Sequence, residues 1–184
     1  VKCRETTLPG VLLVEPDVFG DERGWFLETW REERYRRAGI DFLFSQSNVS
    51  MSRRGVLRGL HFQWPEPQGK LVYVVQGAVW DVAVDIRPDS PQFGQWFGAT
   101  LSDANHHQMW IPEGFAHGFQ VTSEQAIFGY FCTRPYRREH DRAIAHDDPQ
   151  LAIPWPQAPA ELSERDAAAP PLAAFDRADL PGGG

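Results

Sequence analysis

The feature of this sequence that most restricts its fold is a series of short apolar or alternating runs, each ended by Gly, Pro, Asn or Asp. The runs read VLLVEP, LVYVVQGAVWDVAVDI, WFGATL, QMWIPEG, AHGFQV and AIFGYFCT. Runs of about four to eight residues rich in Val, Phe and Trp, bounded by turn residues, are typical of strands in a β-sandwich or β-barrel. We therefore predict an all-β protein.

The stretch from residue 72 to 86 carries the strongest strand pattern. Gln76-Gly77 lies between its two β-rich halves, which predicts a hairpin at that point. In the second half, alternation with period two forms two faces: Val79, Asp81, Ala83 and Asp85 on one, and Trp80, Val82, Val84 and Ile86 on the other. We expect the apolar face to point into the barrel.

Helix is predicted in two places only. Residues 31–38 form a charged stretch that ends before Gly39, which has the position of a C-terminal cap. After Asp148 the chain is rich in Pro and Ala, which predicts an extended segment around the barrel and then a helical turn or two after Ser163. No repeat or long linker divides the chain, so we predict a single domain over residues 1–184.

Charge and composition exclude several classes of partner. The net charge of −7 is unfavourable for nucleic acid, whose unspecific binding depends on neutralising many phosphates. No window approaches a membrane span, and the start lacks the pattern of a signal peptide, so we expect no membrane partner and a cytoplasmic protein. Cys3 and Cys132 lie far apart without CxxC spacing, which argues against a disulfide framework or a thiolate metal site.

Two fragments resemble the two signatures of the cupin jelly-roll family. GLHFQ through QGK occupies the place of the first signature, and PEGFAH fits the second. The usual metal ligands are incomplete, because Gln63 stands for the second histidine and Lys70 for the glutamate, which leaves His61 and His117. A divalent metal site needs three or four N or O ligands, and an ammonium repels a cation. We therefore expect no metal.

Lys70 is one of two lysines in a chain that otherwise uses arginine. Its ammonium is a point charge on a flexible stem, whereas an arginine presents a planar fork suited to carboxylates and phosphates. A lysine in place of a metal ligand can stabilise negative charge that develops on a substrate oxygen. The sequence thus predicts a pocket that binds an oxyanion without a metal.

Eight collinear fragments together resemble the dTDP-4-dehydrorhamnose 3,5-epimerase family, from about residue 5 to 172. They are VFGDERGWFLE, FSQSNVS, GVLRGLHFQ, QGKLV, VWDVAVDIR, SPQFGQW, WIPEGFAHGF and LSERDAAAP. The resemblance implies a cupin jelly roll with a few short peripheral helices, and an isomerase that needs no cofactor. It implies a dTDP-4-keto-6-deoxy sugar as substrate, and a homodimer with exchanged N-terminal strands.

The reaction of that family removes a proton next to a carbonyl, holds an enolate and returns a proton to the opposite face. The resemblance implies that His61 is the base and that Asp166 fixes its tautomer and stabilises the imidazolium. Lys70 matches the residue that stabilises the enolate, and Tyr130 matches the acid on the far face. In the strand pattern, Phe128, Tyr130 and Cys132 share one face, which we expect to point into the barrel.

The nucleotide and the sugar need further contacts, and arginine suits bidentate binding of phosphate. By the same resemblance, the substrate-binding residues are Phe19, Arg23, Glu28, Gln46, Asn48, Arg58, His117, Phe119 and Tyr136. Tyr136 falls where the family has an aromatic residue beside the thymine.

Three alternatives remain open at this point. The segment HDDP, which begins at His146, replaces the family's usual Trp-Asn before its aspartate, and relatives in antibiotic-sugar pathways epimerise only carbon 3 or only carbon 5. A metal-dependent cupin enzyme is motivated by His61 and His117. A jelly roll that binds a nucleotide sugar without catalysis is the third.

Overall fold

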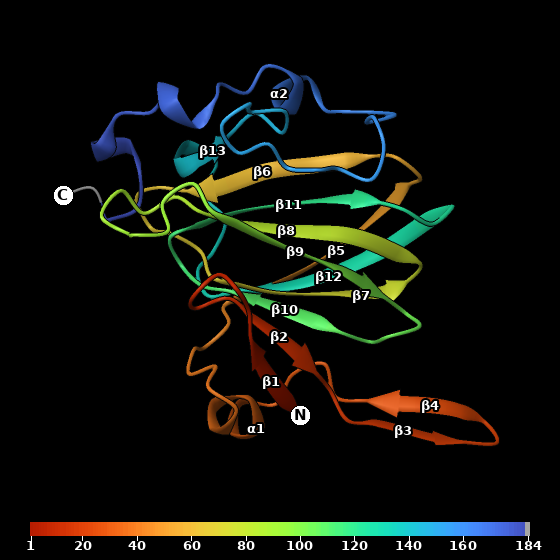
Figure 1. Ribbon diagram of the computed structural model, residues 1–184. Coiled ribbons are helices and arrows are strands. Elements are labelled where there is room, and N and C mark those ends of the chain that lie inside the picture. The colour runs from red at the N-terminus through yellow and green to blue at the C-terminus, as the bar shows by residue number, and fades with distance from the viewer. Residues whose placement is uncertain (183–184) are drawn as a thin grey trace.

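Two antiparallel sheets face each other and enclose the core in the computed structural model, which describes residues 1–182 (Figure 1). The six-stranded sheet has the order β1 (Lys2–Glu5), β2 (Leu12–Glu15), β10 (Gln108–Ile111), β7 (Lys70–Gln76), β12 (Gln125–Cys132) and β5 (Gln46–Arg53). The five-stranded sheet has the order β13 (Asp141–Ala143), β6 (Leu57–Gln63), β11 (Phe115–Val121), β8 (Ala78–Asp85) and β9 (Trp96–Ser102). The all-β prediction is confirmed.

The predicted hairpin at Gln76-Gly77 is wrong in its pairing, although the turn is there. Gly77 has a φ of 84° and separates β7 from β8. However, β7 pairs with β10 and β12, whereas β8 pairs with β11 and β9. The turn therefore carries the chain from one sheet to the other. A sequence pattern that marks two strands and a turn does not say whether the strands share a sheet.

The orientation predicted for β8 is also reversed. Its alternation is as expected, but Val79 and Ala83 belong to the core cluster between the two sheets, together with Phe119 and Phe128. Val82, Val84 and Ile86 lie on the outer side, where Ile144, Leu151, Ile153, Leu172 and Leu180 of the C-terminal segment cover them. Both faces of β8 are therefore buried, and the C-terminal segment covers the more apolar of the two.

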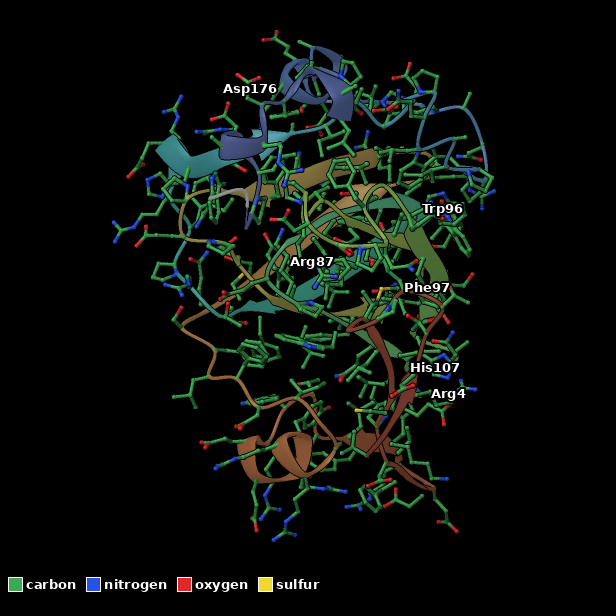
Figure 2. All side chains as sticks on the ribbon, turned by 60° about the vertical axis from the view of Figure 1, so that its left-hand side comes forward. Arg4, Arg87, Trp96, Phe97, His107 and Asp176 are labelled. Atoms are coloured by element: carbon green, nitrogen blue, oxygen red, sulfur yellow. The ribbon has the colours of Figure 1, made fainter. Side chains whose placement is uncertain are left out.

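Strand β9, on which Trp96 and Phe97 are labelled in Figure 2, also packs on both faces, with half-buried side chains. Trp96 packs against the outer cluster, and its Nε1 donates a hydrogen bond to the carbonyl of Leu151 at 3.0 Å. Phe97, the next residue, packs against the cluster between the sheets. The C-terminal segment thus acts as a third layer on the five-stranded sheet, and it is this layer that supplies Asp166.

Both predicted helical regions are confirmed. The helix α1 (Glu32–Arg37) has two acidic residues in its first turn and is followed by Gly39 at φ 102°. Its buried face is Tyr35, whose hydroxyl donates to Oε1 of Gln108 at 2.8 Å. The helix α2 (Glu164–Ala167) begins after Ser163, whose Oγ accepts from the backbone N–H of Asp166 at 3.0 Å. Single 3₁₀ turns lie at Arg138–His140, Leu172–Ala174 and Arg177–Asp179.

A two-stranded hairpin, β3 (Val18–Asp21) with β4 (Gly24–Leu27), projects from the barrel at the lower right of Figure 1. Its apolar side chains are largely exposed: 42 to 64% of the surface of Val18, Phe19, Trp25 and Phe26 is accessible to solvent. No helix among residues 1–182 is long and apolar enough to cross a membrane.

Candidate active site

A cavity of about 400 Å³ opens between the two sheets and collects most of the predicted site residues. Its walls come from both sheets, with His61 on β6 and His117 on β11 facing Lys70 on β7 and Tyr130 on β12. The full lining is Gln46, Asn48, Ser50, Arg58, His61, Gln68, Lys70, His117, Phe119, Phe128, Tyr130, Cys132, Tyr136, Asp141 and Arg165. The prediction that Phe128, Tyr130 and Cys132 point into the barrel is confirmed.

The two histidines are direct cross-strand neighbours, because His117 of β11 is the register partner of His61 of β6. A register shift follows between His117 and Phe119. Gly59 makes this arrangement possible: its φ is 128°, and a Cβ there would lie 2.5 Å from the Cα of Gly118. Only glycine tolerates both the backbone conformation and this close approach of the two strands.

His61 is held from behind by Asp166, which comes from the C-terminal segment 105 residues away. The Nε2 of His61 lies 2.6 Å from Oδ1 of Asp166, and the histidine side chain is 29% exposed whereas the aspartate is 3% exposed. Burial raises the pKa of Asp166, but the hydrogen bond and the charge of His61, with the backbone N–H of Gly59, outweigh it and lower that pKa. The carboxylate therefore stays ionised beside the imidazole.

This pairing fixes the tautomer of His61. An ionised carboxylate only accepts hydrogen bonds, so Nε2 carries the proton and donates a hydrogen bond to Asp166. The other ring nitrogen, Nδ1, keeps its lone pair. An imidazole oriented by a buried carboxylate, with a free nitrogen in an open cavity, is the arrangement of a general base.

His117 has a second carboxylate partner but a different environment. Its Nε2 lies 3.1 and 3.0 Å from the two oxygens of Asp81, and the side chains are 8% and 0% exposed. Burial lowers the pKa of His117, and although Asp81 raises it, the charges of Lys70 and His61 lower it further. His117 is therefore neutral at pH 7. All three side chains line the same cavity.

Lys70 and Tyr130 supply the polar groups of the opposite wall. Lys70 is the register partner of Ile111 on one side and of Cys132 on the other, so paired strands fix its backbone. Burial lowers the pKa of Lys70, which makes its ammonium a readier proton and hydrogen-bond donor. Burial raises the pKa of Tyr130, so its phenol keeps its proton at pH 7.

Five of the predicted binding residues also line this cavity in addition to His117: Gln46, Asn48, Arg58, Phe119 and Tyr136. At its rim, the hydroxyl of Tyr136 donates to Oδ2 of Asp141 at 2.9 Å, and Arg165 pairs with the same carboxylate. Sequence reasoning missed Asp141 and Arg165. Arg165 stands next to Asp166 in the fragment LSERDAAAP, which was an available signal, whereas no motif marks Asp141.

Three predicted binding residues lie elsewhere in the single chain. Phe19 and Arg23 belong to the projecting β3–β4 hairpin, where Arg23 is 89% exposed and pairs with Asp21. Glu28 pairs with Arg34 of α1. None of the three lines the cavity that holds His61. Their role in binding stays a prediction.

Within residues 1–182, no group of three or more His, Cys, Asp or Glu side chains is arranged to hold a metal ion. The two cupin histidines each direct Nε2 to a carboxylate behind them, to Asp166 and to Asp81. Gln63, in place of a further ligand, turns its amide toward backbone groups instead of the cavity. Both cysteines are free thiols.

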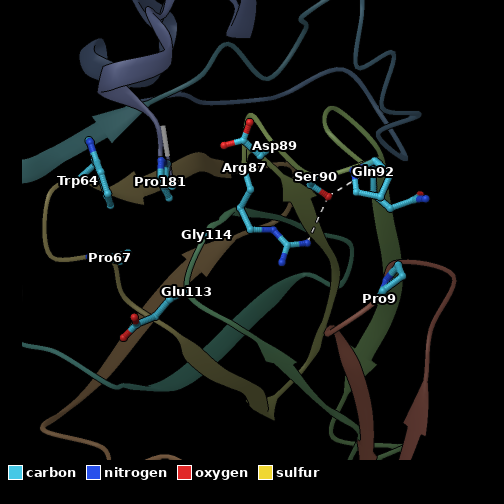
Figure 3. Close-up of a pocket in the computed structure, with 12 residues that line it drawn as sticks. Pro9, Trp64, Pro67, Arg87, Asp89, Ser90, Gln92, Glu113, Gly114 and Pro181 are labelled. Carbon is cyan, nitrogen blue, oxygen red and sulfur yellow. Dashed lines mark hydrogen bonds between the residues drawn. The ribbon is translucent and has the colours of Figure 1, made fainter. Parts of the chain in front are cut away.

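A second depression, of about 560 Å³, shares no lining residue with this cavity (Figure 3). Prolines and Trp64 form much of its wall, and Arg87 crosses it with a hydrogen bond to Ser90. Its described lining includes no His, Lys or Tyr. His61, His117, Lys70 and Tyr130 therefore line the first cavity and not this depression.

Comparison with known proteins agrees with this geometry. The family model for dTDP-4-dehydrorhamnose 3,5-epimerase matches residues 5–174. The enzyme of that name from Pseudomonas aeruginosa is 51% identical over 168 residues, which cover 90% of this chain and 93% of the relative.

Solved structures agree with this assignment. An epimerase from Legionella pneumophila, in complex with dTDP-4-keto-L-rhamnose, superposes with a TM-score of 0.95 at 49% identity, covering 98% and 97% of the two chains. A 3′-monoepimerase from Streptomyces bikiniensis, in complex with dTDP-quinovose, has a TM-score of 0.89 at 35% identity and covers 96% and 91%. The fold is thus the cupin-type sandwich of these epimerases. With half of its residues identical to such enzymes and the family model spanning nearly its whole length, the chain belongs to the dTDP-4-dehydrorhamnose 3,5-epimerase family.

Proposed function

We propose that this chain converts dTDP-4-keto-6-deoxy-D-glucose to dTDP-4-keto-L-rhamnose by epimerising carbons 3 and 5 of the sugar. The observation that carries the proposal is the His61–Asp166 pair, which opens on the same cavity as Lys70 and Tyr130. A ketone placed there meets a base, a cationic donor and a neutral phenol. The reaction needs these three groups and no redox partner.

In each half of the reaction, Nδ1 of His61 takes the proton from the carbon next to the ketone. The electron pair of the broken C–H bond forms the C=C bond of an enolate, and the negative charge develops on the former carbonyl oxygen. Lys70 stabilises that charge by hydrogen bonding. Tyr130 then donates a proton to the opposite face, the enolate collapses to the ketone, and the stereocentre is inverted. Before the next half, His61 releases its proton to water and the Tyr130 phenolate takes one up from water. General acid–base catalysis of this kind contributes about 10²- to 10⁴-fold.

The nucleotide end is held at the rim of the cavity. Arg58 offers a guanidinium to the diphosphate, and Gln46 and Asn48 offer amides. Tyr136, half of whose surface is exposed, offers its ring to the thymine. We place the reaction in the cytoplasm, where this chain acts as a single cupin-type domain in each subunit.

The active species is a homodimer in which the N-terminal strands are exchanged. The exposed apolar side chains of the β3–β4 hairpin support this, because four such residues on one short hairpin expose a surface that water disfavours. In the dimer, Phe19, Arg23 and Glu28 complete the partner's site. Light scattering during gel filtration should give twice the 20.9 kDa of one chain. A monomer with full activity would contradict this part of the proposal.

Incubation with dTDP-4-keto-6-deoxyglucose in heavy water tests the reaction. We expect deuterium at carbons 3 and 5, counted by NMR. Label at one carbon only would establish the second candidate, a single-site epimerase, which is favoured by the likeness to the Streptomyces bikiniensis 3′-monoepimerase and by His146 and Asp147 in the altered HDDP segment. Absence of label from both carbons would overturn both candidates.

A further inference from the structure

Gln63 is a buried amide that the catalytic cavity does not use. It is the last residue of β6, is 3% exposed, and stands two residues after His61 where other cupins have a metal ligand. It does not line the cavity. A buried polar side chain is retained only where its hydrogen bonds are made, so its partners indicate its role.

All the partners of Gln63 are backbone groups of two loops. Its Nε2 donates to the carbonyl of Glu66 at 2.7 Å and to that of Pro135 at 3.4 Å. Its Oε1 accepts from the backbone N–H of Arg137 at 2.7 Å. One side chain thus binds the residue before Tyr136 and the residue after it, and ties both to the loop that precedes Lys70.

Further bonds join the same two loops. Gln68 donates from Nε2 to the carbonyl of Arg134 at 2.7 Å. The backbone of Gly69 exchanges bonds with Thr133: its N–H donates to Oγ1 and its carbonyl accepts from the Thr133 N–H, both at 2.9 Å. Gln63 is the only buried side chain among these contacts within residues 1–182 that reaches both sides of Tyr136.

The two loops differ in how much they need this support. Lys70 lies in a strand that is paired on both sides, so the sheet holds it whether or not Gln63 is present. Tyr136 lies outside any strand or helix, between Cys132 and the 3₁₀ turn at Arg138–His140. Its position rests on side-chain contacts: the flanking bonds to Gln63, a bond from its N–H to Oε1 of Gln46 at 2.7 Å, and its hydroxyl on Asp141.

We propose that Gln63 is a positioning residue that fixes the Tyr136 loop and thereby sets the affinity of the site for the dTDP end of the substrate. The proposal rests on the function given above, in which the ring of Tyr136 meets the thymine. It assigns Gln63 to binding and not to proton transfer, since His61, Asp166 and Lys70 are held by contacts that do not involve it.

Gln120 provides a matched control. It is a buried glutamine on the neighbouring strand β11, 0% exposed, and it also ties a distant loop by its amide. Its Nε2 donates to the carbonyl of Gln157 at 3.0 Å, and its Oε1 accepts from the Gln157 N–H at 3.2 Å. Neither Gln120 nor Gln157 lines the catalytic cavity. Gln63→Met and Gln120→Met each remove one buried amide at similar volume.

The experiment measures dTDP binding by calorimetry, and kcat and KM with the 4-keto sugar, for the full-length chain and both variants. We expect Gln63→Met to weaken dTDP binding and raise KM by about 10- to 100-fold, the loss that a small misplacement causes, with kcat within about threefold of wild type. Gln120→Met should lose similar thermal stability and keep the wild-type Kd for dTDP. Thr133→Val, outside the cavity lining, removes the bond from the Gly69 N–H between the same loops and should raise KM a few-fold.

An unchanged Kd in both Gln63→Met and Thr133→Val would overturn the proposal, as would an equal rise in Gln63→Met and Gln120→Met. A fall in kcat at unchanged KM would also overturn it, since Gln63 would then act on the chemistry. Should Gln63→Met fail to fold, the comparison between Thr133→Val and Gln120→Met decides. Deuterium exchange by the wild-type protein is measured in parallel, so failure of the proposed function is seen separately.

Discussion

The molecule holds two His–Asp pairs on neighbouring strands, and they differ in burial. In one, His61 is 29% exposed and contacts one oxygen of Asp166 at 2.6 Å. In the other, His117 is 8% exposed and contacts both oxygens of Asp81, at 3.1 and 3.0 Å. The two histidines are register partners. The same residue types therefore meet the same cavity from almost the same place.

Their difference shows that a carboxylate partner alone does not make a base. Burial lowers the pKa of His117 despite Asp81, so this imidazole stays neutral and rigid. His61 keeps access to water and substrate on one side, and its carboxylate comes from the separate C-terminal layer. We infer that exposure, more than pairing, assigns proton transfer to His61 and a fixed wall to His117.

The largest effect is expected from replacing His61, which tests directly whether His61 and not His117 transfers the proton. His61→Asn removes the base and should lower kcat by up to about 10⁴-fold, because Asn cannot take a proton from carbon at pH 7. His117→Asn keeps the base and should act mainly on KM and stability. Turnover and deuterium uptake of the two variants give the comparison. Equal losses of kcat would show that both histidines transfer protons.

Removal of the Lys70 ammonium, on the cavity wall opposite the two histidines, should have the next largest effect. Lys70→Met keeps the length of the side chain but deletes the donor for the enolate oxygen, and loss of one such donor costs about 10²- to 10³-fold in kcat. The charge of Lys70 also lowers the pKa of His117, so that pKa should rise in the variant. Steady-state kinetics and an NMR titration of the imidazole measure the two results. A wild-type kcat would remove Lys70 from the mechanism.

Much of the fold follows from residue patterns, but the pairing of strands does not. Runs of Val, Phe and Trp predicted β12 and the side of it that faces the cavity, and the charged stretch before Gly39 predicted α1. The turn at Gly77 was found, yet its strands enter different sheets. The orientation of β8 was reversed because the C-terminal layer covers the apolar face, a contact between residues some 60 or more positions apart. Patterns with period two describe local geometry only.

The catalytic residues of the site were predicted from the sequence, but several carboxylates around them were not. His61, Lys70, Tyr130 and Asp166 were identified by resemblance, and the structure places the first three in one cavity with Asp166 behind His61. Asp81 was noted only as part of a strand face, although a carboxylate in an apolar strand is itself a sign of a buried partner. Contacts to Asp141 depend on loop positions that no local pattern determines.

A smaller effect is expected when the carboxylates are neutralised in place. Asp166→Asn leaves the imidazole of His61 but lets an amide face Nε2, so the tautomer is no longer enforced, and kcat should fall by about 10²-fold, the lower end for general acid–base catalysis. Asp81→Asn should cost stability instead, about 1–3 kcal/mol for a weakened buried contact, with a smaller loss of kcat. Chemical denaturation and kinetics of both variants separate the two effects. If the variants exchange these phenotypes, the roles assigned to the two pairs are reversed.

The smallest effect is a pH dependence of stability that belongs to the buried pair. Burial lowers the pKa of His117 below 6.5. The charges of Lys70 and His61 lower this pKa further, and Asp81 raises it without reversing the shift. As the pH falls below about 6.5, the unfolded chain takes up a proton at this residue while the folded chain does not, so stability must decrease toward the lower folded-state pKa. For one group the slope is at most about 1.4 kcal/mol per pH unit.

Thermal unfolding between pH 7 and pH 5 should therefore give a falling Tm for the wild-type chain and a flatter profile for His117→Gln. His106→Gln, on a loop outside both pairs, is the control and should keep the wild-type slope. The carboxylate of the other pair acts in a separate window, because the lowered pKa of Asp166 makes its contribution disappear only as the pH falls below about 3.8. An unchanged slope in His117→Gln would mean that this histidine accepts a proton in the folded state as readily as in the unfolded chain, and the distinction between the two pairs would then lie in their position relative to the substrate and not in burial.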